Sequence, residues 1–162
     1  MKEKFLVASL LASFYSLAQP NVKLYGYSQL STPGMVTDKK AANKPGKSWD
    51  AALDYFIYLS FNRALSIQPK EVWIKGKRFT ITSSKTVATP VYSPGNTLLV
   101  AQSSSKVMEL KHDSPLPTLA SASLWLKNMI SQNELVVAYS WKGKKYYKAL
   151  KSIKELDTVY NQ

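Results

Sequence analysis

The sequence predicts a mainly β domain, either an antiparallel β-sandwich or a partly open barrel of about eight strands with one or two short helices. Several segments alternate apolar and polar residues with a period of two, as strands with one buried face do. Short turns link neighbouring segments of this kind, which indicates mostly antiparallel pairing. Only one stretch has clear helical spacing. A sheet covered by helices is the alternative architecture.

Residues 1–18 resemble a signal peptide for secretion. Lys2 and Lys4 form a basic start, an uncharged run over residues 5–18 follows, and Ser16 and Ala18 match the small residues of a cleavage site. A helix of that length rises only about 21 Å, less than the roughly 30 Å hydrocarbon core of a bilayer. We therefore expect cleavage rather than a permanent anchor, and a secreted or periplasmic mature protein. Residues 19–162 are expected to form a single β-rich domain.

Charge and cysteine content limit the function classes. The chain carries a formal net charge of +12 and contains no cysteine. Disulfides, thiol catalysis, zinc–cysteine sites and iron–sulfur clusters are therefore excluded. A basic exported domain suggests anionic partners.

The first half contains the clearest strands. Residues 22–30 and 53–61 alternate, and in the second segment one face should be buried. That face consists of Leu53, Tyr55, Ile57, Leu59 and Phe61. Residues 31–48, rich in lysine, proline and glycine, predict a long, exposed, basic loop. Residues 49–52 are compatible with one turn of helix.

Further strands follow from turn signals. Residues 71–82 predict a hairpin around Gly76, and residues 86–92 a further strand. Residues 97–101 and 106–110 are expected to pair through a serine-rich turn. Residues 112–118 contain two prolines and predict a loop.

The remaining elements lie near the C-terminus. Helical spacing runs from Leu119 to Ile130, with Thr118 as the expected cap and Asn133 at the end. Residues 135–141 and 144–149 predict a second hairpin around Gly143. Residues 152–160 fit either a capped helix or a last strand.

The two hairpins carry a matching six-residue pattern: apolar, Lys, Gly, Lys, basic, aromatic. It occupies residues 74–79 and 141–146. The candidate anion-binding residues are Lys75, Lys77, Arg78, Lys142, Lys144 and Lys145. If both turns lie at one end of the domain, these six cations form one patch. The alternative is that they only prevent strand edges from pairing with other molecules. The aromatic residues beside them are expected in the core rather than as stacking platforms.

No catalytic or metal-binding motif stands out. The single histidine, His112, precedes Asp113 in the expected proline-rich loop, where we expect it to be solvated. No nucleophile elbow, P-loop, EF-hand or metalloprotease motif occurs. We expect no cofactor, no metal and no enzymatic activity.

These observations favour an exported, non-enzymatic binding domain that recognises anionic ligands through its basic hairpin turns. An anionic polymer or an acidic protein is the expected partner, with nucleic acid also a candidate. The alternative function is a structural or accessory subunit of a cell-envelope assembly. A third is a hydrolase acting on envelope polymers, which would need two converging carboxylates.

Overall fold

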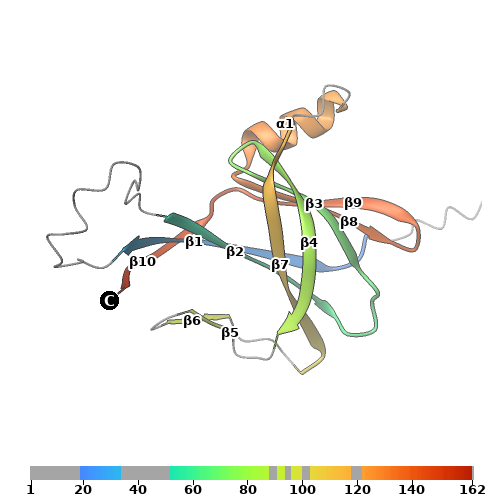
Figure 1. Cartoon of the computed structure of the whole chain (residues 1–162). Helices are drawn as coiled ribbons and strands as arrows, with labels where there is room; N and C mark the ends of the chain where they lie inside the picture. The colour runs from blue at the N-terminus through green and yellow to red at the C-terminus, as the bar shows by residue number, and fades with distance from the viewer. Residues whose placement is uncertain are drawn as a thin grey trace, which may run out of the picture.

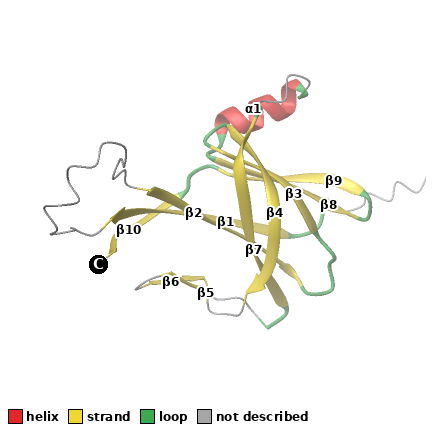
Figure 2. Cartoon of the chain, viewed as in Figure 1, coloured by secondary structure: helices red, strands yellow, loops and turns green. Residues whose placement is uncertain are grey.

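The domain is built around one strongly curled eight-stranded sheet (Figures 1 and 2). The structure is a computed structural model, and it describes residues 19–33, 52–87, 91–93, 96–99, 103–117 and 122–161. The strands are β1 (Val22–Pro33), β2 (Ala52–Asn62), β3 (Gln68–Ile74), β4 (Lys77–Val87), β7 (Ser105–Leu116), β8 (Leu135–Trp141), β9 (Lys144–Leu150) and β10 (Lys154–Asn161). A separate hairpin, β5 (Val91–Ser93) and β6 (Asn96–Leu99), and one helix, α1 (Leu124–Gln132), complete the described elements.

The strand order is β10-β1-β2-β7-β4-β3-β8-β9. All neighbours pair antiparallel except β1 and β10, which are parallel. The predicted fold class, a mainly β domain with a partly open barrel, is confirmed. The C-terminal segment is a strand rather than a helix, which decides between the two alternatives that its sequence allowed.

The hydrophobic core lies on the inner face of the curl. Ile57, Leu59 and Leu110 from β2 and β7 belong to the same buried cluster as Val72 and Val137 from β3 and β8. Curling brings β1 close to the strands on the other side of this core. A Cβ atom added at Gly26 would lie 2.6 Å from Leu135 Cδ2, so the absence of a side chain permits this close approach.

The predicted inner face of β2 is only partly correct. Ile57, Leu59 and Phe61 are buried, but Leu53 is 47% exposed. Leu53 pairs with Leu30 of β1, which is also exposed, so the core does not extend to this end of the β1–β2 pair.

The opposite face of β2 is covered as well. Tyr58 is 3% exposed and packs with Tyr27, Val91 and Val107. The Tyr27 hydroxyl donates a hydrogen bond of 2.8 Å to the Leu98 carbonyl in the small β5–β6 hairpin. Strand β2 is therefore buried on both faces near Tyr58, because the small β5–β6 sheet lies over the second face.

The predicted loop at residues 112–118 is also wrong over most of its length. Strand β7 continues to Leu116 and pairs with β4, with Pro115 opposite Phe79. Pairing between β7 and β2 ends at Leu110, and beyond this point β4 is the one strand among the described residues that pairs with β7. Proline is tolerated where the missing N–H faces an unpaired side.

Two strand boundaries and one strand pairing also differ from expectation. Strand β4 runs through Val87, so the predicted strand at residues 86–92 is divided between β4 and β5. Strand β6 pairs with β5, whereas β7 pairs with β2 and β4, so the predicted pairing of residues 97–101 with 106–110 is wrong. Strand β1 extends to Pro33 into the start of the expected loop, and residues 34–51 lie outside the described residues, as do residues 1–18.

Helix α1 covers part of the outer face of the sheet. Leu126 packs against Trp73, Val136 and Ala138. Ser123 caps the helix by accepting a 3.3 Å hydrogen bond from the Leu126 amide, and Asn133 ends it as predicted. The expected cap, Thr118, lies outside the described residues. Among the residues that the structure places, no helix is long and apolar enough to cross a membrane.

Candidate functional site

The two basic hairpins share the same tight turn. Lys75 and Gly76 have φ angles of 46° and 81°, and Lys142 and Gly143 have φ angles of 48° and 73°. Positive φ at both central residues is typical of a two-residue type I′ turn, whose twist matches that of the flanking strands. Both predicted turn glycines are thus confirmed, and each turn holds its lysines on a short, well-anchored connection.

The two hairpins also match in their strand pairing, beyond the six-residue sequence pattern. Trp73 pairs with Arg78 in the first hairpin, as Ser140 pairs with Lys145 in the second. The residues five positions before the two glycines, Glu71 and Ala138, face each other across the β3–β8 pair. The hairpins are therefore related by an approximate local two-fold axis that passes between Glu71 and Ala138.

This relationship places the two turns at opposite ends of the sheet. Ile74 pairs with Leu135 at one end of β3–β8, and Gln68 pairs with Ser140 at the other. Gly76 is five residues from Glu71, and Gly143 is five residues from Ala138, which faces Glu71. The path between the two glycines along the strands is therefore ten residues, or about 33 Å. Figure 1 shows the β3–β4 turn near α1 and the β8–β9 turn on the far side. The six candidate cations therefore do not form one patch.

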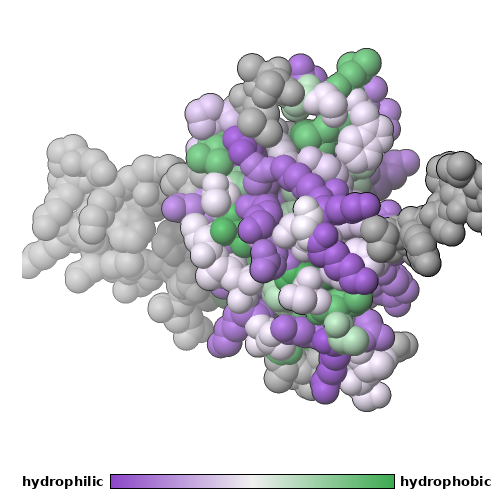
Figure 3. Space-filling view, turned by 90° about the vertical axis from the view of Figure 1, so that its right-hand side faces the viewer, coloured by the Kyte–Doolittle hydropathy of each residue, from purple (hydrophilic) through white to green (hydrophobic). Residues whose placement is uncertain are grey.

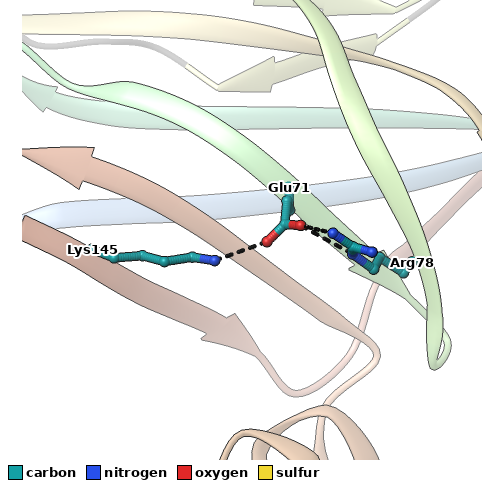
Figure 4. A network of polar contacts seen from close by, with 3 residues as sticks. All are labelled: Glu71, Arg78 and Lys145. Carbon is teal, nitrogen blue, oxygen red and sulfur yellow. Dashed lines mark hydrogen bonds and ion pairs between the residues drawn. The ribbon is translucent and has the colours of Figure 1, made fainter. Parts of the chain in front are cut away.

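Two of the six cations meet at one carboxylate (Figure 4). Arg78 donates from Nε, at 3.0 Å, and from Nη2 to Glu71 Oε1, and Lys145 Nζ donates to Oε2 at 2.9 Å. Arg78 and Lys145 occupy equivalent positions in the two hairpins, so Glu71 on the two-fold axis is within reach of both. Sequence reasoning missed Glu71, because nothing local distinguishes it from the other carboxylates.

The network changes the acidity of its members. Burial alone would raise the pKa of Glu71, but hydrogen bonds and attraction from Arg78 and Lys145 outweigh it and hold that pKa below its usual value. Burial would lower the pKa of Lys145, but Glu71 and then Tyr147 raise it above its usual value. Both shifts keep the network charged at neutral pH.

The other four cations, Lys75, Lys77, Lys142 and Lys144, lie on or beside the turns and are exposed. Arg78 and Lys145 pair with Glu71, and Lys111 pairs with Glu109, whereas these four lysines form no ion pair with another described residue. Lys142 Nζ lies 4.8 Å from the centroid of the Trp141 ring, a cation–π contact. Lys75 borders a recess that also includes the C-terminal end of α1 and Lys151.

The neighbouring aromatic residues belong mostly to the core, as predicted. Trp73 is buried, Phe79 packs against the inner cluster, and Tyr146 stacks on Tyr139 with 5.8 Å between centroids. An exposed aromatic residue lies elsewhere: Trp125 of α1 is 57% exposed and contacts Tyr147 edge-on. Its position outside the apolar helical stripe was the sequence signal for this exposure.

His112 is the chain's single histidine and therefore the first candidate for acid–base catalysis. His112 lies on β7 at a half-buried position, with its ring 4.8 Å from that of Phe79, so the expected loop placement is wrong. Its Nδ1 is 3.4 Å from the Asp113 backbone carbonyl oxygen. In the described ranges, no three histidine or acidic side chains are grouped so that they could hold a metal ion. Tyr58, whose pKa burial and then Glu109 and Tyr27 raise to about 12, remains protonated at neutral pH.

Comparison with protein-family models, curated proteins and solved structures found no match to this chain. The two turns and the charges around them are therefore the basis for inferring function.

Proposed function

We propose that the mature domain is an exported, non-enzymatic binding protein whose basic hairpin turns recognise anionic polysaccharide. One observation carries the proposal: four exposed lysines occupy two equivalent turns and have no carboxylate partner in the described part of the chain. An anionic polymer would supply the missing negative charge and release its own counterions on binding.

The turns suit this role because they are already ordered. Each is closed by a strand pair next to the turn, Ile74 with Lys77 and Trp141 with Lys144. Little backbone freedom is then lost when a ligand binds, which favours affinity. Exposed ammonium groups also stay solvated until the ligand arrives, so binding should weaken as salt concentration rises.

Polysaccharide is favoured over nucleic acid by the surroundings of the turns. Single-stranded nucleic acid is bound through exposed aromatic platforms on which bases stack. Phe79 and Tyr146, which follow the two turns, pack against the core instead. Figure 3 shows hydrophilic side chains spread over one face, with hydrophobic ones in small, separate groups. Such a surface fits charge-based contact with a hydrated polymer.

Arg78 and Lys145 have a different role in this proposal. Glu71 neutralises one of their two positive charges and holds both side chains against it between the two hairpins. The binding contribution therefore belongs to the four turn lysines, and the site is smaller than the six residues that the sequence suggested.

The test is elution of the mature protein from a heparin column in a salt gradient. A first-turn variant combines Lys75→Asn with Lys77→Gln, and a second-turn variant combines Lys142→Asn with Lys144→Gln. Asparagine is used because it tolerates positive φ and preserves the turn. A control variant, Lys85→Gln with Lys154→Gln, removes the same charge from exposed positions on β4 and β10.

Both turn variants should elute at clearly lower salt than the wild type, and the control should elute near the wild type. Equal shifts in all three variants would show that retention follows net charge, and the lysines would then serve only to protect edges. A thymidine oligonucleotide that competes better than a heparin fragment of equal charge would redirect the proposal to nucleic acid.

A further inference from the structure

We infer that each turn is a separate anion site, so that one domain bridges two polyanion chains. This inference rests on the proposed function and adds its stoichiometry and consequence. The observation behind it is the local two-fold relationship, which directs two equivalent basic turns away from each other.

The two sites are electrostatically independent. The turns lie at opposite ends of the β3–β8 pair, about 33 Å apart when followed along the strands, whereas the Debye length at physiological ionic strength is about 8 Å. An anion bound at Lys142 and Lys144 therefore neither attracts nor repels one bound at Lys75 and Lys77. Equivalent turns with independent charges predict two sites of similar affinity.

The route between the turns is obstructed for a single chain. On the outer face, α1 packs over Trp73 and Val136. This paired position lies between the local two-fold axis and the turn at Lys75 and Gly76. The C-terminal end of α1 reaches the recess beside Lys75 and Gly76. The inner face is filled by the hydrophobic core. A polymer lying at one turn cannot run straight across the sheet to the other, and so the second turn is left for a second chain.

A compact probe tests the number of sites. Sucrose octasulfate is too short to reach both turns, and isothermal titration calorimetry counts the molecules that bind. We expect two per protein for the wild type and for the Lys85→Gln, Lys154→Gln control, and one for each turn variant. Combining both turn variants should abolish binding.

Long heparin tests bridging directly. The wild type should produce turbidity that is maximal at an intermediate ratio and disappears in excess heparin, when each turn holds its own chain. Each turn variant should still bind heparin but lose the turbidity.

The outcomes separate the two proposals. One probe molecule per wild-type protein, lost in either turn variant, would show a single composite site and overturn bridging while leaving polysaccharide binding intact. Wild-type binding without turbidity would also overturn bridging. No binding of either probe would refute the proposed function itself.

Discussion

Replacing Glu71 with glutamine removes the charge that Arg78 and Lys145 share. The side chains of Glu71 and Arg78 are only 15% and 19% exposed, so the guanidinium would remain largely buried without an anionic acceptor. A hydrogen bond to a charged group contributes about 1.5–3 kcal/mol. Because glutamine keeps one acceptor oxygen, we expect Glu71→Gln to lower the free energy of unfolding by about 2 kcal/mol.

The two halves of the network should differ in strength. Lys145 is 47% exposed, so solvent screens its attraction to Glu71, and a coupling of about 0.2–1 kcal/mol is expected. The more buried Arg78 pair should couple more strongly, by about 1.5–3 kcal/mol. Double-mutant cycles with Arg78→Met and Lys145→Met, measured by urea unfolding at pH 7, give both coupling energies.

The same network predicts a dependence of stability on pH. The pKa of Glu71 is lower in the folded than in the unfolded state, so its stabilisation is complete above the unfolded value of about 4.3. It is lost as the pH falls through the lower folded value. Glu71→Gln should lack this part of the acid dependence. A Lys145 coupling as large as that of Arg78, or an unchanged acid profile in the variant, would refute the reasoning.

Three other predictions concern processing and packing. We predict that the chain is exported with cleavage after Ala18, so that the product begins at Gln19; an intact mass that includes residues 1–18 would contradict this. Ile57→Ala should lower the free energy of unfolding by about 2–5 kcal/mol, as measured by denaturant melts. Leu53→Ala, at a half-exposed site on the same strand, should lower it by less than about 1 kcal/mol. Equal losses would contradict the finding that the core does not extend to Leu53. Gly26→Ala should cost about 1–3 kcal/mol because its methyl group would meet Leu135, and an unchanged melt would show that β1 and β8 separate easily.

Local features of the chain were sufficient to predict several elements. Glycine at positions 76 and 143 indicated turns that require positive φ, and both are present. The alternation at residues 53–61 identified β2, and Asn133 marked the end of α1. These signals depend on backbone conformation and side-chain period over a few neighbouring residues, which a sequence displays directly.

Properties that depend on distant segments needed the tertiary structure. Tyr58 is buried because a separate hairpin covers its face, and residues 112–116 form a strand because β4 pairs with them. Glu71 gains its importance from Lys145, which is 74 residues away in the chain.

The direction of the basic turns was decided in the same way. The sequence by itself determined that two equivalent turns carry lysines. The antiparallel pairing of β3 with β8 decided that they point to opposite ends and that Arg78 and Lys145 converge between them. The physical reason is that turn conformation depends on local backbone geometry, whereas strand partnership depends on which apolar faces the whole chain buries together.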